Sequence, residues 1–94
     1  MFPKDEVIFS DPKVVNAYII SKQYGKAAAI YINQIKANPD NADSYTALAA
    51  VYLQAGQDTM AIETLRNVSK RLPLLKPQAD EWIKQIQEGK FKNL

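Results

Sequence analysis

The chain has 94 residues with 12 basic and 10 acidic side chains, and it contains neither His nor Cys. This length fits one small domain, which must be held together by packing because no disulfide can form. Zinc and copper would lack their preferred ligands, so we expect no metal site and no cofactor. The nearly balanced charge gives no strong electrostatic attraction to nucleic acid or anionic lipid.

The first helix is predicted over residues 12–22. Asp11 is a good N-cap acceptor, and Pro12 suits the first helical position, where its missing N–H is not needed. A short turn around residues 23–25 leads to a second helix over residues 26–37. That helix ends before Pro39, because the residue preceding a proline is pushed out of helical backbone space.

Three further helices are predicted over residues 42–55, 59–71 and 77–88. Gly56 is expected to end the third helix in a left-handed conformation, and Asp58 to cap the fourth. Each of the five helices has apolar residues at steps of three and four, and no strand is predicted. Connections this short make neighbouring helices antiparallel, which gives an all-α fold.

The chain resembles itself when it is shifted by 34 residues. Three pairs coincide and define the repeat most clearly: Tyr18 with Tyr52, Ala27 with Ala61, and Pro39 with Pro73. A fixed period of this size is typical of repeat proteins, in which each unit buries its apolar face against the next unit. Such proteins usually display a surface for binding, so the period favours an interaction protein.

These residues resemble the tetratricopeptide repeat, whose pattern has a Leu-small pair, a Tyr, a small residue in the second helix and a closing Pro. The resemblance implies a right-handed superhelix of antiparallel helix pairs. It divides the chain into an apolar segment (1–10), a first repeat (11–41), a second repeat (42–75), a capping helix (76–89) and a polar tail (90–94). The first repeat departs from the pattern, with Lys22 at the usual Gly and Gln34 at a usually small apolar position.

The resemblance further implies a non-catalytic interaction module or scaffold. In such proteins the first helix of each pair lines a concave groove that binds a peptide or protein segment. Ala47 and Ala50 would leave this groove open at its middle. The candidate contact residues are Lys13, Asn16, Ile20, Thr46, Ala47, Ala50, Gln54, Asp80, Glu81 and Lys84.

Two other functions stay open. The stretches 23–27 and 75–80 resemble repeats at the C-terminus of bacterial membrane-embedded glycan ligases or polymerases, which would make the chain a soluble accessory domain. The basic stretch from Arg66 to Lys76 could instead bind nucleic acid, although no aromatic residue is interleaved with its cations. Catalysis is not expected, because the three Gly are scattered and no nucleophile has a plausible base.

The apolar N-terminal segment is expected to fold back over the first repeat as a cap. Phe2, Val7, Ile8 and Phe9 are too apolar for a free tail, and a homodimer through this edge is the alternative. The apolar stretches 14–20 and 27–32 are too short to span a membrane, and the acidic N-terminus does not resemble a signal peptide. The absence of Cys favours a cytoplasmic location, or an envelope location if the chain belongs to a membrane protein.

Overall fold

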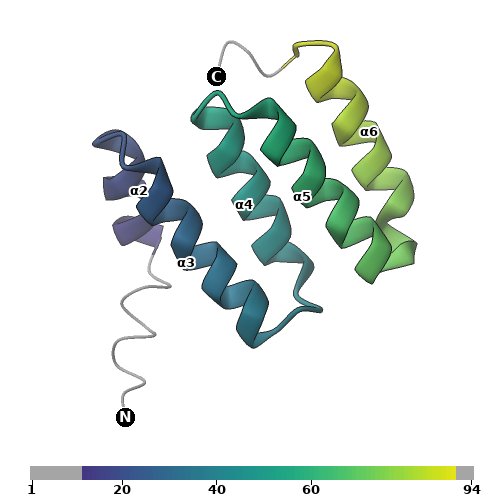
Figure 1. The fold of residues 1–94 in the computed structure, drawn as a ribbon, viewed down its shortest axis with the longest axis horizontal. Helices are drawn as coiled ribbons and strands as arrows, with labels where there is room; N and C mark the ends of the chain where they lie inside the picture. The colour runs from purple at the N-terminus through teal and green to yellow at the C-terminus, as the bar shows by residue number, and fades with distance from the viewer. Residues whose placement is uncertain (1–11, 91–94) are drawn as a thin grey trace.

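The computed structural model describes residues 12–90, and within this range every regular element is helical (Figure 1). The all-α prediction is therefore confirmed. The predicted roles of Asp11 as a cap and of residues 1–10 as an edge segment lie outside the described residues. The elements in chain order are α2 (Pro12–Ile20), α3 (Tyr24–Ala37), α4 (Ala42–Gln54), α5 (Asp58–Arg71), a 3-10 turn η1 (Pro73–Leu75) and α6 (Lys76–Gln87).

Each helix packs against the helix that follows it in the chain, so the helices form a row from α2 to α6 (Figure 1). The described part is a flat body of 42 × 30 × 15 Å. Helix α4 lies at its centre, because it contributes buried side chains to both of the apolar cores. Paired helices stacked in this way are the arrangement that the 34-residue period predicts.

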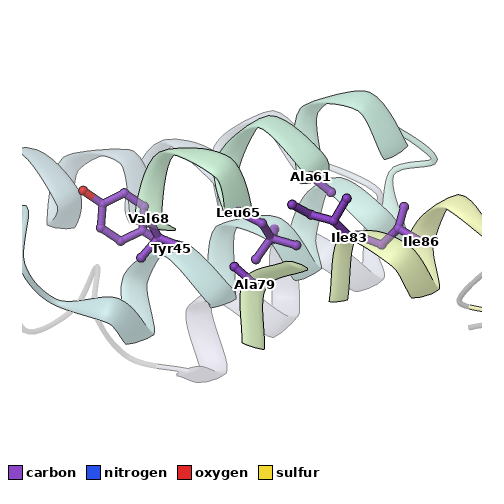
Figure 2. Packing of buried hydrophobic residues seen from close by; sticks show 8 residues of the cluster. Tyr45, Ala61, Leu65, Val68, Ala79, Ile83 and Ile86 are labelled. Atoms are coloured by element: carbon purple, nitrogen blue, oxygen red, sulfur yellow. The ribbon is translucent and has the colours of Figure 1, made fainter. Parts of the chain in front are cut away.

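The C-terminal core lies among α4, α5 and α6 (Figure 2). Ala61 of α5 is fully buried at its centre, with Leu65 and Val68 following at the three- and four-residue steps of one helix face. Ala79, Ile83 and Ile86 of α6 meet these residues from the other side. The small side chain of Ala61 lets neighbouring backbones approach closely, as the repeat pattern predicts.

The N-terminal core lies among α2, α3 and α4 and is built around Ala27, which is also fully buried. Ala28 and Ile30 of α3 pack there with Val15, the only described residue of α2 that is buried. Leu48 and Val51 of α4 complete this cluster. The positions of Ala27 and Ala61, 34 residues apart, show that the two helix pairs repeat the same packing.

The α2–α3 turn differs from the prediction. Helix α2 ends at Ile20 and not at residue 22, because the backbone N–H groups of Lys22 and Gln23 turn back to the carbonyl oxygens of Ile19 (3.0 Å) and Tyr18 (2.7 Å). Lys22 then takes a left-handed backbone with φ 61°. Helix α3 starts two residues earlier than predicted, at Tyr24, so this residue and its neighbour are helical.

The remaining helix ends mostly follow their sequence signals. Asn41 caps α4, since its Oδ1 accepts from the backbone N–H of Asp43 at 3.0 Å. Gly56 has φ 77° just beyond α4, as predicted. The predicted cap of α5 is wrong, because Asp58 is the first residue of the helix and Gln57 before it makes no side-chain cap. The 3-10 turn that follows Leu72 was not predicted.

Candidate partner-binding surface

Helix α4 presents the middle of the candidate surface. Ala50 and Gln54 are exposed, while Thr46 and Ala47 are half-buried. Ala50 follows Thr46 by four residues and Ala47 by three, and Gln54 follows Ala50 by four, so these residues share one side of the helix. The Thr46 hydroxyl donates to the carbonyl oxygen of Asp43 at 3.0 Å, which directs its polar atom back to the helix.

Helix α2 contributes three of the candidate contacts. Lys13, Asn16 and Ile20 are all exposed and lie on one helix face, opposite to the buried Val15. Ile20 keeps 81% of its surface in contact with solvent, so it offers an apolar contact to a partner. The Asn16 side-chain amide forms no hydrogen bond with another described residue, so it is available to a partner.

Helix α6 contributes the charged end of the surface. Asp80, Glu81 and Lys84 are exposed. The Lys76 ammonium contacts the Asp80 carboxylate at 2.7 Å, and the Gln85 amide donates to Glu81 Oε2 at 3.1 Å. The cations Lys76 and Lys84 balance the carboxylates of Asp80 and Glu81, so this end of the surface has little net charge.

The candidate contacts form rows across the three helices, because residues 34 apart take equivalent places. We call these rows the first-helix surface. One row lies at the N-terminal side of each helix, one in the middle and one at the C-terminal side. In that order, the rows are Lys13–Ala47–Glu81, Asn16–Ala50–Lys84 and Ile20–Gln54–Glu88. All of their members are exposed except Ala47, which is half-buried.

Packing places α4 between the other two helices of this surface. Val15 of α2 shares a core cluster with Leu48 of α4, and Ile83 of α6 shares the other cluster with Ala49 of α4. Helices α2, α4 and α6 therefore follow one another in space as they do in the repeat. That this layer is concave, and that its exposed residues contact a partner, both stay predictions.

Sequence reasoning missed two residues of this surface, Glu88 at the end of the third row and Asp43. Asp43 is exposed and lies four residues before Ala47, so it falls on the same face of α4. The i, i+4 step that relates it to Ala47 was the available signal. Its carboxylate places a negative charge beside the alanines at the centre of the surface.

The basic stretch from Arg66 to Lys76 is partly neutralised by the fold. Arg71 Nε contacts Asp40 Oδ1 at 2.8 Å, and Lys76 is paired with Asp80. The hydrogen bond that Arg71 donates to Asp40 raises the pKa of the guanidinium, which keeps it charged. Two of the four cations thus have acidic partners. The stretch therefore attracts the phosphate groups of a nucleic acid less strongly than its sequence suggests.

Neither a metal site nor a membrane-spanning helix is found among residues 12–90. No three acidic side chains there come together in a group that could hold a metal ion. In the same range, every helix is too short or too polar to cross a bilayer.

Comparison with known proteins gives one positive result. The sequence profile described as a tetratricopeptide repeat matches residues 18–81, which is more than half of the chain. No match was found among curated proteins or among solved structures. Proteins of the matching family generally mediate protein–protein interaction and are typically non-catalytic. The profile match, the 34-residue period and the stacked helix pairs agree, and the chain belongs to the tetratricopeptide repeat family.

Proposed function

We propose that this protein is a non-catalytic interaction module that binds an extended segment of a partner protein across the first-helix surface. The observation that carries the proposal is the exposure of equivalent positions on α2, α4 and α6. A segment that crosses three stacked helices meets the same place on each of them. A repeat architecture suits such a ligand because it offers an extended surface and not a closed pocket.

The side chains at the middle of the surface suit a peptide backbone. Ala47 and Ala50 extend no further than Cβ, so a partner segment can come close to α4. The amides of Asn16 and Gln54 form no hydrogen bonds with other described residues, and each can donate to and accept from a peptide group. Recognition of this kind relies on van der Waals contact and on hydrogen bonds to the peptide backbone. The side chains of the partner segment would determine specificity.

The charge of the surface predicts how binding responds to salt. Asp80 is paired with Lys76, and Glu88 is paired with Lys90 at 3.4 Å, so few charges are left unbalanced. Exposed charges are screened over about 8–10 Å at physiological salt, so a balanced surface gains little from them. We therefore expect peptide affinity to change less than tenfold between low and physiological salt. Nucleic-acid binding would fall much more steeply.

Two alanines allow a matched test. Ala50 is exposed at the centre of the first-helix surface, and Ala29 is exposed on α3, which belongs to the other helix layer. Peptides would be selected from a random displayed library with the full chain and then measured by titration calorimetry. We expect Ala50→Glu to weaken binding at least tenfold, because the longer charged side chain blocks the approach to α4. Ala29→Glu should leave affinity unchanged.

Other outcomes would count against the proposal. Equal losses in the two variants would place the binding site elsewhere or indicate a general loss of folding, which circular dichroism distinguishes. Selection of no peptide above background, together with tight salt-sensitive binding to random RNA, would favour a nucleic-acid binder. Unaltered peptide affinity in the Ala50→Glu variant would show that the peptide does not bind at the first-helix surface, which contradicts the proposal.

A further inference from the structure

The second helices of the two pairs, α3 and α5, carry cations without acidic partners. Helix α3 contains two lysines and no acidic residue, and the C-terminal half of α5 contains only basic charges. Three of these cations are exposed and form no ion pair with another described residue: Lys36, Arg66 and Lys70. The exposed amides of Asn33 and Asn67 lie one turn before the two lysines. We call these five residues the second-helix patch.

The fold brings the two halves of the patch to one edge of the body. The two lysines are 34 residues apart, as are the two asparagines, so they take equivalent places in the repeat. Helices α3 and α5 end at the same edge (Figure 1). Arg71 at the end of α5 contacts Asp40, which follows α3, at 2.8 Å. Ile35 of α3 also packs against the C-terminal core, which includes side chains of α5.

The acids that flank the patch do not neutralise it. The Asp40 carboxylate is engaged by Arg71, and Glu63 lies one turn before Arg66 without forming an ion pair with it. A lysine in the last turn of a helix is favoured by the helix dipole, but Arg66 lies more than one turn before the end of α5. The dipole therefore does not account for the whole patch. Unpaired cations attract carboxylates, with which they form strong charge-assisted hydrogen bonds.

We propose that the second-helix patch binds an acidic segment of a further partner protein, with carboxylates at alternate positions. Arg66 and Lys70 are about 6 Å apart along α5, at 1.5 Å per residue. Alternate residues of an extended chain are about 6.6 Å apart, at 3.3 Å per residue. Two carboxylates of such a segment can therefore meet both cations. The amides of Asn33 and Asn67 can donate to and accept from its peptide groups.

The patch suits a protein segment better than a nucleic acid. Proteins that bind single strands stack the bases on exposed aromatic side chains. Tyr24 and Tyr31 of α3 are half-buried, and α5 has no aromatic residue. Three unpaired cations also neutralise few phosphates, so the release of counterions would contribute little to binding.

This inference does not rest on the proposed function, because it concerns the other helix layer. The two surfaces together would let the protein join two partners, which bind without competing. Loss of library-peptide binding in the Ala50→Glu variant would leave the second-helix patch unaffected. Loss of acidic-peptide binding through the patch would likewise leave the first-helix surface unaffected.

The test uses a labelled peptide of eight residues in which Glu and Ser alternate. Its binding to the full chain would be followed by fluorescence anisotropy at about 0.05 M salt, where exposed charges are less screened than at physiological salt. A peptide with Gln in place of Glu is the matched probe. Lys70→Glu tests the patch, and Lys84→Glu is the control. Both lysines are exposed in the last turn of a helix, so the two changes alter net charge and dipole interactions alike.

We expect Lys70→Glu to weaken binding of the acidic peptide at least fivefold, and Lys84→Glu less than twofold. Lys36→Glu, on the other helix, should act like Lys70→Glu. Glu63→Gln should strengthen binding about twofold, because it removes a repelling charge beside Arg66. Equal losses for Lys70→Glu and Lys84→Glu would indicate a general attraction to the chain and overturn the proposal. Equal binding of the Gln peptide, or tighter binding of an oligothymidine with the same charge, would overturn it as well.

Discussion

Lys22 and Gly56 occupy the same place in two successive helical hairpins and share a left-handed backbone, with φ 61° and 77°. Their surroundings repeat as well. The N–H of Lys22 donates to the Ile19 carbonyl at 3.0 Å, and the N–H of Gly56 donates to the Leu53 carbonyl at 3.0 Å. Each residue therefore closes the C-terminus of a first helix, but only the glycine does so without steric cost.

Replacing Lys22 with Gly should stabilise the protein. A left-handed conformation costs an L-residue about 1–2 kcal/mol, and part of the gain is lost because glycine is more flexible in the unfolded chain. We expect Lys22→Gly to raise the free energy of unfolding by about 0.5–1 kcal/mol, measured by urea denaturation. An unchanged or lowered midpoint would show that this turn does not constrain Lys22.

Gly56 and Gly25 provide controls, because replacing them with Ala should change the free energy of unfolding in opposite directions. Gly56→Ala should destabilise the protein, by about 1 kcal/mol or more, although a Cβ there would meet no atom within 4 Å. The cost is purely conformational. Gly25 lies in the first turn of α3 and also has open space, so Gly25→Ala should be neutral or slightly stabilising.

The second departure from the family pattern, Gln34, has a partner that the sequence did not reveal. The buried Ser44 hydroxyl of α4 donates to Gln34 Oε1 of α3 at 3.1 Å. Ser44→Ala should cost about 0.5–1.5 kcal/mol, because the half-buried Gln34 carbonyl loses a hydrogen bond. In a Gln34→Leu background the same change should be neutral or stabilising. A double-mutant cycle by thermal denaturation gives the coupling, and additive effects would contradict this prediction.

The Tyr45 hydroxyl fixes the loop between α3 and α4. It donates to the Pro39 carbonyl oxygen at 2.8 Å, while its ring lies in the C-terminal core (Figure 2). Tyr45→Phe keeps the ring and should lower the free energy of unfolding by about 1 kcal/mol. Tyr45→Leu also removes the aromatic packing and should cost more. Equal losses in the two variants would mean that the hydrogen bond contributes nothing beyond the ring.

Alkaline pH should destabilise the protein partly through Tyr31. Burial raises the pKa of this hydroxyl above its ordinary value of 10.0, because the phenolate is disfavoured away from water. The folded state then holds its proton more tightly than the unfolded state, so stability falls as pH rises beyond about 10. Tyr31→Phe should make this loss with pH less steep in urea midpoints measured from pH 9 to 11. Parallel curves for the two proteins would contradict it.

The fold followed from the sequence because its main signals are local. Apolar steps of three and four placed the helices, and the 34-residue period paired Ala27 with Ala61. The burial of Val51 has a tertiary cause that the local pattern does not show. Helix α4 packs on two sides, so its buried residues are not confined to the single face assumed for an amphipathic helix. The first-helix surface was predictable in outline from the same period, but the Asp40–Arg71 ion pair joins residues 31 apart in sequence and needed the coordinates.

Ala61, buried at the centre of the C-terminal core, provides the most direct test of the repeat packing. Ala61 has no exposed surface, and Leu65 and Ile83 belong to the same tightly packed cluster. Ala61→Leu would force extra methyl groups into that core, which typically costs about 1–3 kcal/mol. The matched change Ala29→Leu, at an exposed position of α3, should be nearly neutral. If both variants unfold at the same urea concentration as the parent, close packing at Ala61 does not limit the approach of the helices. Close packing would then not explain why alanine occurs both at position 27 and at position 61.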